Sequence, residues 1–155
     1  MPVVESAIEI AAPRDKLFAL AQDYGLRLRW DPFLREMRFR GGAGRAAVGV
    51  RVRVKARNGL TMEVEYVTFQ PPEQVAMKMI HGPFFFEHFA GSWRFKASGS
   101  DRTTVTFRYV FSTRFRLVRP LLDAIVKGVL LYDVRARLRG LKTCAETTDA
   151  LGALP

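Results

Sequence analysis

The sequence contains few of the residues that form disulfides and metal sites. Its 155 residues include one cysteine, Cys144, and two histidines, His81 and His88. A single cysteine cannot form a disulfide within the chain, and we expect Cys144 to have a structural role. The two histidines lack further ligands at a spacing typical of metal sites, so the sequence predicts no bound metal.

Long apolar runs and nucleotide-binding motifs are also missing. No stretch of about 18 consecutive apolar residues occurs, which argues against a membrane-spanning helix. Residues 1–5 lack a basic region followed by an apolar one, so we expect a cytoplasmic protein. The glycine-rich segment 41–44 lacks the Gly-Lys-Ser/Thr ending of a phosphate-binding loop, and no dinucleotide fingerprint or nucleophile elbow is found. No cofactor is therefore expected.

Acidic residues are scarce relative to basic ones. The chain has 15 Asp and Glu against 25 Lys and Arg, a formal net charge of +10. Such a charge favours anionic partners such as acidic ligands, phospholipid head groups or nucleic acid. No zinc-finger spacing, helix-turn-helix pattern or RNA-binding aromatic motif accompanies the arginines, so we do not expect specific nucleic-acid binding.

Alternation of apolar and polar residues predicts a sheet of about six to seven strands. The sequence Asn58-Gly59 predicts a two-residue type I′ turn, because both residue types tolerate positive φ. We expect Glu63 and Glu65 to lie beside the arginines of the preceding strand. The expected strands cover residues 3–10, 35–40, 48–56, the segment from about 62 to 70, and residues 75–81, 85–96 and 103–113.

Helical periodicity is confined to two places. A helix is expected from Pro13 to near Gly25, followed by a short helical or irregular piece that Asp31-Pro32 interrupts. After Pro120 the chain is expected to form one long helix to about Thr147. Its apolar stripe comprises Leu122, Val126, Leu130, Val134, Leu138, Leu141 and Ala145, and the arginines at 135, 137 and 139 are expected to lie mostly outside it. The pattern predicts one α+β domain with an antiparallel sheet over residues 1–155.

Two segments resemble a known family. Residues 4–13, followed by Leu17-Phe18-Ala19-Leu20 and then Trp30, are similar to the start of the START-like (SRPBCC) polyketide cyclase/dehydrase and lipid-transport family. Gly91-Ser92-Trp93-Arg94-Phe95, followed after a turn by residues 102–106, is similar as well. The resemblance implies a helix-grip fold, in which a curved antiparallel sheet is wrapped around a long C-terminal helix and two short helices follow the first strand.

The resemblance also implies that an apolar or aromatic molecule binds between the sheet and the last helix. Trp30 would then lie at the cavity entrance as a lid residue, and Arg29 would meet an anionic group of the ligand. The same inward-facing residues can instead pack together as an ordinary core. The candidate ligand-binding residues are Trp30, Met62, Val64, Tyr66, Met77, Met79, Phe89, Trp93, Phe95, Phe107, Tyr109 and Phe111.

Four polar residues are candidates for acid–base chemistry. Strict alternation places Glu87 on the same face as Phe89, where desolvation would raise the pKa of its carboxyl. A bulge near Gly82-Pro83 would instead turn Glu87 to solvent. His81 follows the inward methionines in phase, and Tyr66 and Tyr109 carry hydroxyl groups on the expected inner face.

Three functions follow as hypotheses. The first is the binding or carriage of a hydrophobic small molecule, such as a lipid, quinone or polyketide-like compound, with an anionic group as an option. The second is a polyketide aromatase/cyclase or dehydratase that uses Glu87, Tyr109, His81 or Tyr66. The third is a membrane or partner-binding module that uses the basic row Arg51, Arg53, Lys55 and Arg57. The sequence leaves open whether residues 84–86 or 121–134 rest on a membrane, and whether the protein is a monomer or a homodimer.

Overall fold

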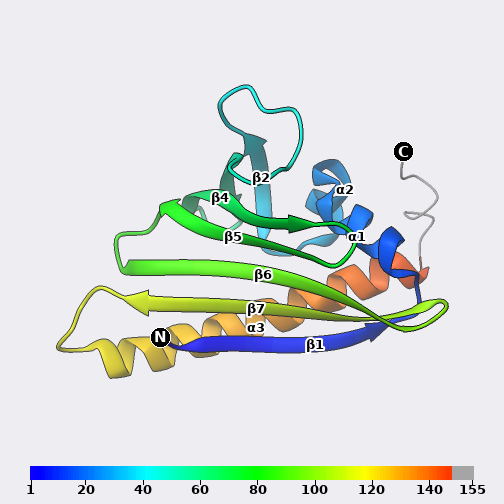
Figure 1. Ribbon diagram of the computed structural model, residues 1–155. Helices are drawn as coiled ribbons and strands as arrows, with labels where there is room; N and C mark the ends of the chain where they lie inside the picture. Colours follow the sequence, from blue (N-terminus) through cyan, green and yellow to red (C-terminus); the bar gives the residue numbers. More distant parts are fainter. Residues whose placement is uncertain (148–155) are drawn as a thin grey trace.

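The computed structural model describes residues 1–147 of the chain, which form seven strands and three helices (Figure 1). The expected single domain over 1–155 therefore includes eight residues that lie outside the described part. In chain order the elements are β1 (Val3–Ile10), α1 (Arg14–Gln22), α2 (Tyr24–Trp30), β2 (Leu34–Phe39), β3 (Arg51–Ala56), β4 (Thr61–Gln70), β5 (Gln74–His81), β6 (Phe86–Gly99), β7 (Arg102–Thr113) and α3 (Arg119–Thr147).

The strands form one antiparallel sheet in the order β1-β7-β6-β5-β4-β3-β2. The 29-residue helix α3 runs along one face of this sheet, and α1 and α2 lie at the end where α3 finishes (Figure 1). This arrangement is the helix-grip fold, and it confirms the predicted fold class. The pairing of β1 with β7 joins the N-terminal strand to the last strand and leaves β2 at the opposite edge.

Alternation along β7 determines which side chains enter the core. Val105, Phe107, Tyr109 and Phe111 are buried, as their period of two predicts, and Arg108 between them is exposed. β6 and β7 have 14 and 12 residues, well above the usual five or six. Strands of this length form a sheet face that is too large for a single helix to cover completely.

Two predictions about β3 are wrong in detail. The strand begins at Arg51 rather than at Val48, because Gly49 adopts a positive φ of 88° and Val48 is exposed. The following turn is not type I′, because Asn58 keeps a negative φ and positive φ is found at Gly59. The Asn58 side chain instead accepts a hydrogen bond of 3.0 Å from the backbone N–H of Leu60.

The expected pairing of acids and bases across β3 and β4 is confirmed. Arg51 lies opposite Glu65, with 3.3 Å between Nε and Oε1, and Arg53 lies opposite Glu63. Glu65 also approaches Lys78 of β5 at 3.7 Å. The basic row of β3 is thus partly neutralised by its neighbour strand.

Helix α3 has two different halves. From Leu130 onward the predicted stripe is buried, with Val134, Leu138 and Leu141 almost inaccessible to solvent. Toward the start of the helix, Val126 is only half-buried. The prediction that Arg137 avoids the stripe is wrong, because this side chain is also buried. The second half of α3 is therefore packed tightly and the first half is not.

The tight half of α3 depends on a glycine. A Cβ atom at Gly140 would overlap the backbone carbonyl oxygen of Trp30, where α2 ends. Gly128, in the same helix, has open space where its Cβ would stand. The absent side chain at Gly140 allows α2 and α3 to approach closely, and it places the end of α2 beside the core.

We expect Gly140→Ala to destabilise the protein by at least about 1 kcal/mol, because a packed backbone must move to admit one methyl group. Gly128→Ala is the matched control, and it should stabilise the helix by about 0.5–1 kcal/mol. Urea denaturation followed by circular dichroism measures both. Equal effects of the two substitutions would contradict the close contact.

Candidate functional site

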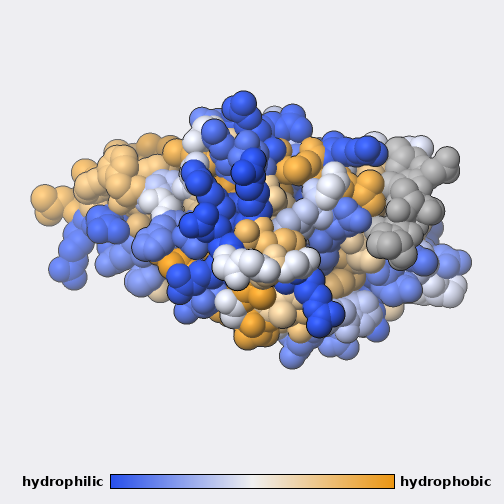
Figure 2. All heavy atoms as spheres, turned by 90° about the horizontal axis from the view of Figure 1, so that it is seen from above, coloured by the Kyte–Doolittle hydropathy of each residue, from blue (hydrophilic) through white to orange (hydrophobic). Residues whose placement is uncertain are grey.

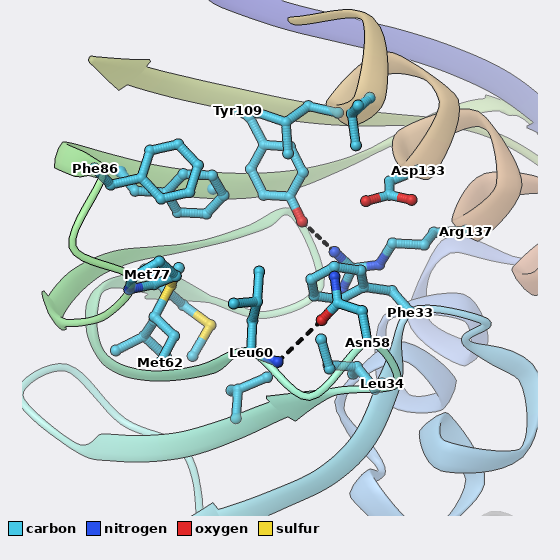
Figure 3. A pocket seen from close by; sticks show the side chains of 18 of the residues that line it. Phe33, Leu34, Asn58, Leu60, Met62, Met77, Phe86, Tyr109, Asp133 and Arg137 are labelled. Carbon is cyan, nitrogen blue, oxygen red and sulfur yellow. Dashed lines mark hydrogen bonds between the residues drawn. The ribbon is translucent and has the colours of Figure 1, made fainter. Parts of the chain in front are cut away.

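A cavity of about 310 Å³ lies between the sheet and the first half of α3 (Figure 3). Its walls come from β2 to β7, from the β3–β4 hairpin, from α2 and from α3. The cavity forms where α3 is packed loosely, since Val126 and Leu130 line it while Leu138 and Leu141 fill the core beyond its inner end. The hollow thus follows from long, curved strands that one helix covers only in part.

Most of the cavity wall is apolar. Met62 and Met77 lie on the side of β4 and β5, and Phe86 closes the wall on β6 (Figure 3). Methionine side chains are unbranched and adapt their shape to what they contact. This wall is suited to a flexible or flat hydrophobic molecule, and it offers no hydrogen bonds that would orient one.

Charged groups gather at the inner end of the cavity. Asp31, which follows α2, is completely buried and accepts hydrogen bonds from Arg137 Nε at 3.0 Å and Arg27 Nε at 3.3 Å. Its other oxygen accepts the backbone N–H of Phe33 at 3.0 Å. Arg137 also donates to the hydroxyl of Tyr109 (Figure 3). We call Arg27, Asp31, Tyr109 and Arg137 the buried polar cluster.

Aromatic rings hold the two guanidinium groups in place. The Arg137 guanidinium carbon lies 4.7 Å from the ring centre of Phe107 and 5.0 Å from that of Phe33. Arg27 lies 5.5 Å from the ring centre of Trp93. Cation–π contacts of this kind are strongest where water is excluded. The rings and Asp31 therefore fix both guanidinium groups in position, and both arginines line the cavity.

The buried polar cluster contains more positive than negative groups. Two guanidinium groups share the single carboxylate of Asp31, and both arginines line the cavity. A buried charge without full compensation is costly in a medium of low dielectric constant. The cavity is the space from which another molecule could reach these two arginines, and Asp133 lines it as well.

Asp133 is a second carboxyl group at the cavity, one helical turn before Arg137, and it points into the space (Figure 3). Desolvation by burial raises the pKa of Asp133, Arg137 lowers it, and the negative charge of Asp31 raises it further, with a net upward shift. Burial likewise raises the pKa of the Tyr109 hydroxyl, against the opposing effect of Arg137. Both groups therefore hold their protons more firmly than usual.

Seven of the predicted ligand-binding residues line the cavity: Met62, Val64, Met77, Phe89, Trp93, Phe107 and Tyr109. The other five do not. Tyr66 is buried and hydrogen-bonded to Tyr24 at 2.5 Å and to Gln22 at 3.1 Å. Phe95 and Phe111 belong to the solid core, and Met79 packs against that core beside the cavity.

Trp30 is not a lid residue. It is buried at the end of α2, and its ring makes an edge contact with that of Trp93 at 6.1 Å. Arg29 is exposed and does not line the cavity, so the arginine of α2 that faces a ligand is Arg27. The helix rotates by about 100° per residue, so Arg27 and Arg29 lie on nearly opposite faces of α2.

The two remaining catalytic candidates lie outside the cavity. The pairing of β6 with β7 shifts between Phe86 and His88, and this bulge turns Phe86 inward and Glu87 to the surface. Glu87 there forms an ion pair with Arg119 at 3.0 Å. His81 is exposed at the end of β5. Of the proposed acid–base groups, Tyr109 is the one that lines the cavity, while Tyr66 is buried beside α1 and α2.

The sequence-based prediction missed Arg27, Arg137 and Asp133. A signal for Arg137 exists, because the buried positions Leu130, Val134, Arg137 and Leu141 follow one another at spacings of three or four. The four-residue spacing of Arg27 and Asp31 is typical of a helical ion pair. Nothing in the sequence shows that Arg137 contacts the Arg27–Asp31 pair.

Two kinds of site are not found within residues 1–147. No group of three or more histidine, cysteine, aspartate or glutamate residues is arranged to hold a metal ion. No helix in this part of the chain is long and apolar enough to cross a membrane.

Comparison with known proteins identifies a family for nearly the whole chain. A family model described as polyketide cyclase/dehydrase and lipid transport matches residues 1–146. A search of curated proteins finds no match.

Solved structures share the fold at low sequence identity. A protein from Thermus thermophilus is 18% identical, with a TM-score of 0.76 over 98% of both chains. A START superfamily protein from Mycobacterium smegmatis is 15% identical, with a TM-score of 0.73 over 93% of this chain and 97% of its own. The Zhui aromatase/cyclase from a Streptomyces species is 19% identical, with a TM-score of 0.72 over 94% of this chain and 96% of its own.

We expect Asp31→Asn to destabilise the protein by about 3–5 kcal/mol, because it leaves two buried guanidinium groups without their counter-ion. Glu65→Gln is the control, since it removes a carboxylate that pairs with two cations at the surface, and it should cost at most about 1 kcal/mol. The free energy of unfolding in urea measures both. A loss of less than about 1 kcal/mol for Asp31→Asn would contradict the role given to this carboxylate.

Proposed function

Because this chain belongs to the polyketide cyclase/dehydrase and lipid-transport family, we propose that it binds a hydrophobic small molecule with an acidic group. The ligand occupies the cavity between the sheet and α3. Its acidic group contacts Arg27 and Arg137, and its apolar part lies against the methionine and phenylalanine wall. The protein acts as a binding or carrier protein for this molecule.

The buried polar cluster is the observation that carries the proposal. An ordinary core rarely contains two buried guanidinium groups that share one fully buried carboxylate, because buried charges cost free energy. In the proposed complex, a carboxylate or similar group of the ligand adds negative charge beside the two arginines and accepts hydrogen bonds from their guanidinium groups, in a geometry that arginine favours. The net positive charge of the chain also attracts such a molecule from solution.

The size of the cavity limits the ligand. Its volume of about 310 Å³ is at the lower end of the range of roughly 300–1,000 Å³ typical of small-molecule sites. A medium-length fatty acid or a compound of one or two rings is of suitable size, whereas a large lipid with two acyl chains is not. Polar contacts are concentrated at the inner end, so the acidic group enters first.

Catalysis is the second candidate, favoured by two groups in the same cavity. The pKa values of Tyr109 and Asp133 are both raised by burial, and both groups lie beside Arg137. In a cyclase or dehydratase these groups would donate protons to a carbonyl that Arg137 polarises. Incubation with a polyketide-like β-ketoacid distinguishes the functions, because an enzyme converts it faster than it reacts in buffer alone and a carrier does not.

We expect the protein to bind dodecanoic acid at least about tenfold more tightly than its methyl ester, because only the acid carries a negative charge that can pair with the arginines. Isothermal titration calorimetry at neutral pH measures both affinities. Arg137→Gln should remove most of the preference for the acid, and Arg27→Gln is the second variant if the first fails to fold.

Arg29→Gln is the matched control, since this arginine is exposed on the same helix as Arg27 and should leave the preference unchanged. Met77→Leu controls for the apolar wall, and it should affect acid and ester alike. Equal affinities for acid and ester in the unmodified protein would contradict the proposed orientation.

A pH dependence follows from Asp133. Its raised pKa means that it gains a proton at a higher pH than an ordinary aspartate, and this removes a negative charge next to Arg137. The affinity for an anion therefore rises as the pH falls through the pKa of Asp133. Anilinonaphthalene sulfonate is the suitable probe, because its sulfonate stays ionised over this range.

Fluorescence titration of the probe as a function of pH should show this rise in the unmodified protein. In Asp133→Asn the affinity should be higher at neutral pH and should no longer depend on pH in this range. An undiminished pH dependence in the variant would assign the effect to another group.

A further inference from the structure

A large apolar surface lies at the end of the molecule where α3 begins. Figure 2 shows hydrophobic residues gathered at this end, on the left of the view. Leu117 is 99% exposed, Phe84 74% and Leu121 67%. We call the following residues the mouth patch: Phe84, Phe115, Leu117, Val118, Leu121, Ile125, Val129 and Tyr132.

The mouth patch is continuous and adjoins the cavity. The rings of Phe84 and Phe115 contact each other edge to face at 6.1 Å, which joins the β5–β6 connection to the β7–α3 connection. Phe84 also contacts Phe85 at 5.8 Å, and Phe85 lines the cavity. Ile125 and Val129 belong to both the patch and the cavity wall. The patch therefore borders the cavity on the side of α3 and of the β5–β6 connection.

Helical spacing explains why this surface is apolar. Leu121, Ile125, Val129 and Tyr132 follow one another at intervals of four, four and three, so they share one face of α3. The face that carries Val126 and Leu130 is directed to the cavity. The first half of α3 is thus apolar on a second, outward face, which a soluble monomer rarely exposes without a partner.

Basic residues flank the mouth patch on both sides. Arg114 and Arg116 alternate with its members before α3 begins, and both are exposed. Arg135 and Arg139 are exposed farther along the helix, at spacings that continue the face of Tyr132.

Two nearby acids are already engaged. Glu87 pairs with Arg119 at 3.0 Å, and Asp123 accepts a hydrogen bond from Thr113 at 2.6 Å. An apolar surface between arginines thus remains without a covering partner in residues 1–147.

We propose that the mouth patch docks on a lipid bilayer that contains acidic phospholipids. The apolar side chains enter the boundary between head groups and acyl chains, with the first half of α3 parallel to the surface, and the flanking arginines contact phosphate groups. Docking in this orientation places the cavity mouth on the membrane. A second copy of the chain is a less suitable partner, because a symmetric contact brings like-charged rims together.

The test is co-sedimentation with vesicles of phosphatidylcholine, with or without phosphatidylglycerol. We expect binding to the vesicles with phosphatidylglycerol, weakened by added salt, and little binding to phosphatidylcholine alone. The combined substitution Phe84→Ser, Leu117→Ser and Leu121→Ser should lower the affinity at least about tenfold, since these side chains no longer gain by leaving water. None of the three lines the cavity.

Two controls separate the patch from general surface properties. Val48→Ser with Val67→Ser changes exposed apolar residues elsewhere and should leave vesicle binding unchanged. Arg116→Gln with Arg135→Gln should lower the affinity about tenfold, whereas Arg38→Gln with Arg53→Gln, which removes as many exposed charges near the β2 edge, should not.

Three outcomes would overturn the proposal: no binding to either vesicle, equal binding by the triple variant, or equal losses from both arginine pairs. Dimerisation in light scattering that the triple variant abolishes, together with absent vesicle binding, would assign the patch to a second copy. Leu117→Ser alone serves as the test if the triple variant fails to fold, because a side chain exposed to this degree contributes little to the core. Fatty acid titration is independent of vesicle binding, so either proposal can fail alone.

Discussion

The carboxylate of Asp31 connects α2 to α3 inside the core, and the arrangement of the site depends on this contact. It binds Arg27 at 3.3 Å and Arg137 at 3.0 Å, and both guanidinium groups are almost completely buried. Without it, two cations would lie in a medium of low dielectric constant, and the end of α2 would lose its link to α3. The close approach that Gly140 permits brings the two helices within reach of each other. Packing and charge therefore specify the same geometry.

The two halves of α3 divide the molecule by role. The second half packs Val134, Leu138 and Leu141 against the sheet and forms a solid core with it. The first half leaves a hollow on one side and an apolar surface on the other, and neither contributes to stability as a packed core would. The two proposed binding functions account for this arrangement. A ligand would cover the inner face of the first half, and a membrane would cover the outer face. The buried polar cluster lies at the border of the two halves, so the cavity is polar at its inner end and apolar along the rest of its wall.

Much of this fold was predictable from the sequence, and most of the site was not. Strict alternation identified β1 and β7, and helical periodicity identified α3, because each element directs one apolar face to the space between the sheet and the helix. Alternation failed at Glu87, where one extra residue in β6 reverses the phase, and at Val48, where Gly49 turns the chain. Arg137 looked like a surface residue because arginine usually is one. Its burial depends on Asp31, 106 positions away in the chain, and no local pattern records such a pairing.

In the proposed complex, the cavity binds an amphipathic acid with its acidic group at Arg27 and Arg137. A crystal structure of the protein with dodecanoic acid tests it most directly. We predict a carboxylate within hydrogen-bond distance of the two guanidinium groups and an alkyl chain along Met62, Met77 and Phe86. An empty cavity at saturating ligand, or a carboxylate directed to the mouth with the chain against the arginines, would contradict it.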